Sequence, residues 1–268
     1  MFAVASARSV ASFGGAPLGV STRVNHGLSS TMTPDAHRIL ASLQQVSVQR
    51  AANHGDPRQE AHVAAVKAYQ QRRFRLTYAE LLNDSRYGPA ARFFLDELYG
   101  PTDYRERDAQ FERVVPALAR LFPKEMVHTV SLLAELHALS ESLDAAMAGH
   151  IMSLPLSATG YVAAWRATGR RADRASQIQL MLKVGTALDR YTHNPLLRSS
   201  LRLMRGPARA AGLSSLQDFL EKGFDTFRAM RGASVFLSTI AEREQELVTA
   251  LFDESNLADA LPLSKQLP

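Results

Sequence analysis

The feature that most constrains the fold is the spacing of the apolar residues, which recur every three to four positions through most of the chain. Leu132, Leu136, Leu139, Leu143 and Met147 alternate steps of four and three, which places them along one stripe of an α-helix. No stretch of the sequence shows the period-two alternation of β-branched residues that is typical of strands. The sequence therefore predicts an all-α fold, in which helices bury their apolar stripes against one another.

Capping and turn residues divide this pattern into about nine helices, which we expect to form one multi-helix bundle. Thr33-Pro34-Asp35 is a typical helix start. The apolar phase continues through Pro116, which predicts a kink rather than an end. The phase slips by one residue at Gly232, which predicts a second kink or a tight break. We expect the long C-terminal helices to pack against a central helix at 124–148.

The ends of the chain are expected to lie outside the bundle. No acidic residue precedes Asp35, and the stretch before it carries Arg8, Arg23 and several serines and glycines. Three interpretations of residues 1–33 remain open: a disordered tail, a mis-assigned start with Met32 as the true one, and a weakly transit-like segment. Residues 34–253 are predicted to form a single helical domain, and residues 254–268 a frayed tail.

Composition excludes several classes of protein. Of the 268 residues, 46% are hydrophobic and 21% charged, as in ordinary globular domains. The absence of cysteine excludes a disulfide framework, a thiolate zinc site and a cysteine nucleophile. The apolar runs are shorter than the roughly 20 residues that cross a bilayer, so we expect no membrane span and a cytoplasmic location. The chain also lacks the glycine-rich phosphate loops and the G-x-S-x-G elbow of common enzymes.

The leading hypothesis that follows is a non-enzymatic interaction or regulatory domain without a cofactor. No complete catalytic set of residues occurs in the sequence, whereas the helical seams for packing are strong. We expect an unidentified protein as the partner, and self-association into a homo-oligomer is a further alternative.

A second hypothesis is a helical cofactor- or metal-binding protein of haem-oxygenase-like or ferritin-like shape. Glu125 and His128 stand three positions apart and share a helix face, and His137, Glu141 and Asp144 share another face of the same helix. Di-iron bundles need two Glu–His pairs and two more inward carboxylates, and the sequence supplies one pair. The alternative is an acid that favours the helix start, beside a surface histidine.

A third hypothesis is the binding of acidic partners by a basic helix face. Its members are spaced i, i+4, i+7 and i+11, opposite Leu197, Leu201 and Met204: Arg198, Arg202, Arg205 and Arg209. Such a face attracts anionic partners. The alternative is a solvated face that is paired with neighbouring acidic residues. The next helix opens with Ser-Ser-Leu-Gln, which is poor in base-reading side chains, so we do not expect nucleic acid as the partner.

The densest polar and aromatic segment runs from Arg92 to Pro116, around the turn at residues 99–101. A ligand- or partner-facing surface there would use Arg92, Asp96, Tyr99, Asp103, Arg107 and Asp108. The alternative is structural, because turn and capping chemistry already accounts for most of these residue types.

This segment, together with LRLMRGPARAAGL at 201–213 and FRAMRGASVFLSTIAERE at 227–244, resembles a helical family of proteobacteria whose function is not characterised. The resemblance covers roughly residues 60–250. It implies a bacterial, all-helical domain, and it carries over no catalytic residue.

Overall fold

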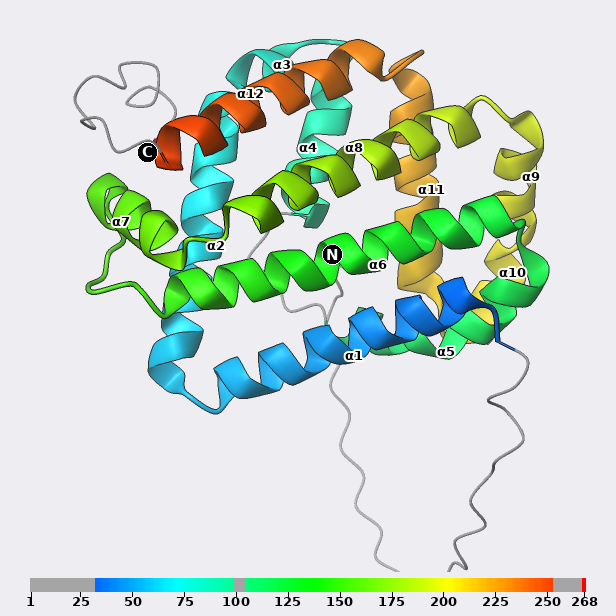
Figure 1. The fold of residues 1–268 in the computed structure, drawn as a ribbon. Helices are drawn as coiled ribbons and strands as arrows, with labels where there is room; N and C mark the ends of the chain where they lie inside the picture. The colour runs from blue at the N-terminus through cyan, green and yellow to red at the C-terminus, as the bar shows by residue number, and fades with distance from the viewer. Residues whose placement is uncertain (1–31, 99–104, 253–266) are drawn as a thin grey trace, which may run out of the picture.

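The computed structural model describes residues 32–98, 105–252 and 267–268, and these contain helices and no strand (Figure 1). The all-α prediction is therefore confirmed for the described part of the chain. The helices are α1 (Pro34–His54), α2 (Pro57–Thr77), α3 (Ala79–Asn83), α4 (Gly88–Leu98), α5 (Arg105–Leu121), α6 (Lys124–Ala148), α7 (Ala158–Thr168), α8 (Arg171–Thr192), α9 (Pro195–Leu203), α10 (Arg205–Ala210), α11 (Ser214–Ala229) and α12 (Ser234–Phe252).

Four long helices form a row in the order α1, α6, α8 and α12 (Figure 1). On the far side of this row, α2 crosses it at one end and α11 at the other. The helix α2 packs against α1 and α6, and α11 packs against α8, α4 and α9. The prediction that the C-terminal helices pack against α6 was wrong, because α11 and α12 pack mainly against α8. Periodicity shows that a helix has an apolar stripe, but it does not identify the helix that covers the stripe.

Several helix ends follow the capping residues that the sequence offers. The Thr33 side chain accepts a hydrogen bond from the Ala36 amide at 3.3 Å, and Asp56 accepts one from Arg58 at 2.9 Å. Ser157 caps α7 in the same way, and Gly169 ends it with a φ of 64°. These short side chains satisfy amides that have no partner within the helix.

Other boundaries differ from the expectation, and they bring the number of helices above nine. The stretch from Pro57 to Asn83 forms two helices, α2 and α3, which are separated at Tyr78, where the Thr77 carbonyl accepts a hydrogen bond from Arg243 of α12 at 2.5 Å. The helix α5 runs through Pro116 without ending, as predicted. Near Gly232 the structure has the break, the second of the two predicted alternatives, since α11 ends at Ala229 and α12 begins at Ser234.

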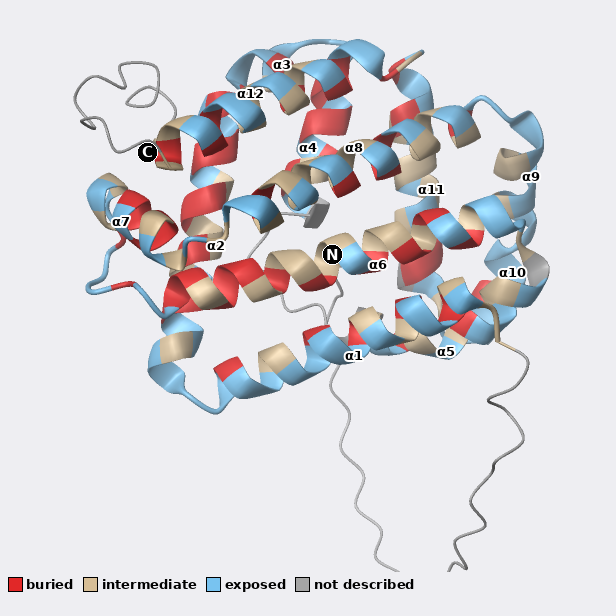
Figure 2. Ribbon diagram, in the orientation of Figure 1, coloured by how far each residue is buried: buried red, intermediate tan, exposed pale blue. Residues whose placement is uncertain are grey.

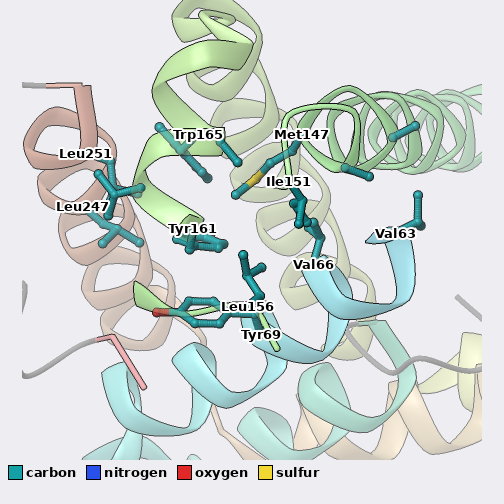
Figure 3. Packing of buried hydrophobic residues seen from close by; sticks show 14 of the residues in the cluster. Val63, Val66, Tyr69, Met147, Ile151, Leu156, Tyr161, Trp165, Leu247 and Leu251 are labelled. Atoms are coloured by element: carbon teal, nitrogen blue, oxygen red, sulfur yellow. The ribbon is translucent and has the colours of Figure 1, made fainter. Parts of the chain in front are cut away.

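The apolar core is divided into three main clusters. One lies where α2, the end of α6, α7 and α12 meet (Figure 3), with the Tyr69 and Tyr161 rings stacked 4.3 Å apart. A second joins α2, α4, α11 and α12, and a third joins α1, α5 and the first half of α6. The helix α6 therefore enters one cluster through Val127 and Ala134 and another through Ala145 and Met147.

No helix in the described ranges has the length and apolar character that a membrane crossing requires.

Candidate functional site

Between its two apolar ends, α6 carries a polar section that points into the protein. Glu141 is 4% exposed, and its Oε1 accepts from the Arg50 guanidinium and from Lys67 Nζ, both at 2.8 Å. Arg50 also donates to Asp108 Oδ2 at 2.6 Å, and His137 Nε2 lies 3.3 Å from the same oxygen. Arg50, Lys67, Asp108, His137 and Glu141, from α1, α2, α5 and α6, are named the internal ionic cluster below.

The pairing within this cluster compensates for the burial of its charges. Burial alone would raise the pKa of Glu141, but the charges of Lys67 and Arg50 outweigh it and lower that pKa to about 2. Burial acts against the charged form of Arg50, yet Glu141 and Asp108 raise its pKa. Both residues are therefore held in their charged forms.

Asp144 lies one turn further along α6, in a different setting. Its Oδ1 accepts from Gln70 Nε2 of α2 at 3.1 Å, and the residue is 7% exposed. Burial raises the pKa of Asp144, and the charges of Lys67 and Arg174 oppose that rise only in part. The two inward carboxylates of α6 thus differ in which protonation state their surroundings favour.

The sequence-based metal candidates do not converge on one site. His137, Glu141 and Asp144 face inward, whereas Glu125 is exposed and the half-exposed His128 lies 3.2 Å from Asp35 at the surface. Within the described ranges, no group of three or more histidine, aspartate and glutamate side chains is arranged to hold a metal ion. Arg50 and Lys67 supply the positive charge that the carboxylates of the internal ionic cluster need.

Sequence reasoning missed the residues that complete this cluster. Arg50, Lys67 and Gln70 carry no motif, and only the packing of α1 and α2 against α6 brings them to its polar face. One sequence feature could have indicated the α2 residues. Lys67, Gln70 and Arg73 place a polar residue at every third position within a stripe of α2 that is otherwise buried.

The candidates in the segment from Arg92 to Pro116 are dispersed. Arg92 is exposed and donates to the Leu82 carbonyl at 2.7 Å, and Asp96 is exposed one turn further along α4. Tyr99 and Asp103 lie outside the described residues, and the side chain of Arg107 is also outside them. Asp108 faces the protein interior, within the internal ionic cluster.

The basic face is half neutralised by α11. Arg198 forms a bidentate pair with Asp225 at 2.8 and 2.9 Å, and Arg205 forms one with Glu221. The hydrogen bond from Arg205 lowers the pKa of Glu221 to about 2. Arg202 and Arg209 are exposed, and neither forms an ion pair with a residue that the structure describes. The interpretation of a face paired with acidic neighbours thus applies to Arg198 and Arg205.

The predicted basic face is divided between two helices, since Arg198 and Arg202 lie on α9 whereas Arg205 and Arg209 lie on α10. The first of these helices also exposes apolar side chains. No residue of α9 is buried (Figure 2). Leu196 is 73% and Leu203 is 79% exposed, and they lie seven positions apart on one face of the helix. Met204, expected on the inner side, is 41% exposed, and Leu220 of the neighbouring α11 is 42% exposed. Leu196, Leu203, Met204, Leu220, Arg202 and Arg209 are named the α9 surface below.

Comparison with known proteins matches residues 49–258 to a family defined by a domain of unknown function, DUF8198. The chain belongs to the DUF8198 family. The match confirms the resemblance to a family of unknown function, and the proteobacterial origin stays a prediction. The DUF8198 range contains every member of the internal ionic cluster and the whole α9 surface. No curated protein and no solved structure matches this DUF8198 chain.

Proposed function

We propose that the protein is a non-enzymatic interaction domain that binds an acidic, partly apolar segment of a partner protein along the α9 surface. The observation that carries this proposal is the exposure of Leu196 and Leu203 on one face of a helix that buries no residue. A helix of a globular protein normally turns its apolar stripe to the core, and grouped exposed apolar side chains favour an interaction site.

The charge of the α9 surface selects the kind of partner. Arg202 and Arg209 form no ion pair with a described residue, whereas Arg198 and Arg205 are already paired with α11. Unpaired guanidinium groups beside apolar side chains favour a partner with carboxylates around an apolar stripe. The partner therefore supplies negative charge as well as apolar contact.

The way α9 is attached favours this role. It is held to α11 by ion pairs and by a hydrogen bond of 2.5 Å from Gln217 to the Leu201 carbonyl, while Leu197 and Leu201 are only half-buried. The internal ionic cluster, in contrast, joins four helices in the interior and stabilises the scaffold that holds α9.

The test is photo-crosslinking in cells, with a crosslinking amino acid at position 203 and a matched control at the exposed Val48 of α1. We expect position 203 to capture a protein segment rich in Asp and Glu, and position 48 not to capture it. Arg202→Glu with Arg209→Glu should abolish the capture, and a synthetic peptide of that segment should bind less tightly as salt is added.

Three outcomes would count against the proposal. They are identical adducts at positions 203 and 48, capture of a segment without acidic residues, and capture of a second copy of the chain. The last outcome would instead favour self-association.

A further inference from the structure

A pocket of about 310 Å³ opens between the end of α8 and the turn that joins α11 to α12. It is lined by Thr192, His193 and Pro195 on one side and by Arg228 and Arg231 on the other. Among the residues that the structure describes, none that lines it is acidic. The pocket is separate from the internal ionic cluster, and its arginines do not belong to the α9 surface.

The two arginines bring positive charge that the described part of the chain does not neutralise. Neither Arg228 nor Arg231 forms an ion pair with a described residue. The carboxylate of Asp225, one turn before Arg228, is already held by both donors of Arg198. Guanidinium groups present several fixed N–H donors, a geometry suited to the oxygens of a phosphoryl group.

The backbone holds Arg231 in an unusual conformation at the rim of this pocket. Its φ is 52°, in the left-handed region, and Gly232 follows with a φ of 112°. Arg86 stabilises the turn by three hydrogen bonds to its backbone. It donates to the carbonyls of Met230 at 2.5 Å, Arg231 at 3.1 Å and Gly232 at 3.2 Å. A non-glycine residue in this region persists when its surroundings determine it, and such positions cluster at functional sites.

A hydrogen bond to a backbone carbonyl also orients His193, on the opposite wall of the pocket. His193 Nδ1 donates to the Asp189 carbonyl at 2.7 Å, which fixes the orientation of the ring.

The geometry points to a binding site for a phosphomonoester, with Arg228 and Arg231 as the ligands of the phosphoryl oxygens and His193 opposite them. Its volume lies at the lower end of the range of about 300–1,000 Å³ for small-molecule sites. That size suits a small phosphorylated compound better than a nucleotide. Pro195 provides an apolar wall for the carbon skeleton.

Isothermal titration calorimetry on the full chain tests this assignment, with inorganic phosphate and glycerol 3-phosphate as probes. The pocket variant is Arg228→Gln with Arg231→Asn, since asparagine tolerates a left-handed φ. The matched control is Arg202→Gln with Arg209→Gln, which removes the same charge from the α9 surface. We expect saturable binding by the wild type and the control, and binding weaker by about tenfold or more in the pocket variant.

Equal weakening in both variants would show a diffuse charge effect and would overturn the site, as would the absence of saturable binding to the wild type. Vesicles with and without phosphatidic acid distinguish a lipid headgroup from a soluble ester. Binding to phosphatidic acid vesicles without binding to glycerol 3-phosphate would overturn the assignment of a soluble ligand. The pocket variant keeps the α9 surface intact, so failure here is distinguishable from failure of the proposed function.

Discussion

At the scale of single residues, α6 places two buried carboxylates one turn apart in opposite electrostatic surroundings. Glu141 receives two cationic donors, Arg50 and Lys67, whereas Asp144 receives one amide donor from Gln70. Burial disfavours the charged form of both, and only Glu141 is compensated beyond that penalty. The two positions are therefore expected to respond in opposite directions to the loss of charge.

Glu141→Gln should lower the free energy of unfolding at pH 7 by about 3 kcal/mol, which corresponds to the depression of its pKa. Because the pKa of Glu141 in the folded state is about 2 and its ordinary value is 4.5, its stabilisation is fully present above about pH 4.5. It is lost as the pH falls through 2. Urea unfolding at pH 7 and near pH 3 measures both the loss and its pH dependence. Glu135→Gln, at an exposed position of the same helix, is the control and should change little.

Asp144→Asn should leave stability at pH 7 unchanged or raise it by up to about 1 kcal/mol, because it removes a desolvated charge. The amide oxygen can still accept from Gln70. For a carboxyl whose folded-state pKa is raised, the penalty applies at high pH and is relieved as the pH falls through that pKa. The same urea experiment serves as the measurement. A loss as large as that of Glu141→Gln would contradict this view of Asp144.

At the scale of elements, α8 and α12 approach each other closely where Gly185 faces Leu237. A Cβ at position 185 would lie 2.6 Å from Leu237 Cδ2, whereas the nearest atom to a Cβ at Gly55, apart from its chain neighbours, would be the Ala52 carbonyl oxygen at 3.5 Å. The packing of α8 on α12 thus depends on the absence of a side chain at 185.

Gly185→Val should therefore destabilise the protein by about 1–3 kcal/mol through overpacking. Gly55→Val should cost much less, since an added Cβ there meets the Ala52 and Ala51 carbonyl oxygens only at the ordinary contact distances of 3.5 and 3.6 Å. Thermal unfolding of the two variants compares them directly, and equal shifts of the midpoint would show that the contact with Leu237 does not limit the approach.

The element scale also shows what sequence can and cannot predict. The starts of α1 and α2 follow from Thr33 and Asp56, because capping is local chemistry. The separation of α2 and α3 at Tyr78 coincides with a hydrogen bond from Arg243, more than 160 residues away in the chain, and no local pattern contains that contact. His137, Glu141 and Asp144 could be selected from their spacing, but their partners Arg50 and Lys67 depend on how the helices pack. The exposure of Leu203 could not be predicted from the sequence either, because a helix with leucines on several sides does not show which of these sides packs against the protein.

At the scale of the whole molecule, the family match includes only the end of α1, the helix that covers one face of α6. The matched range begins at residue 49, whereas Ala36, Ile39 and Leu43 of α1 are buried against Val127 and Ala134. Most of the apolar cover of the first half of α6 thus lies before the matched range.

A fragment of residues 49–258 should consequently unfold at a lower temperature than the full chain and should tend to aggregate. It would retain Arg50 but expose the apolar side chains of α6. A fragment of residues 32–268, which keeps all of α1, is the control and should match the full chain. Differential scanning calorimetry with light scattering measures both properties, and equal behaviour of the two fragments would contradict the structural role of α1.

The position of α8 determines how the protein is expected to unfold. It is a shared wall, with α6 on one side and α11 and α12 on the other. If either half of the bundle unfolded alone, it would expose apolar side chains of the other half. We therefore expect denaturant to unfold the protein in one cooperative transition. The fluorescence of Trp165, the sole tryptophan, should then report the same midpoint as the loss of helix throughout the chain.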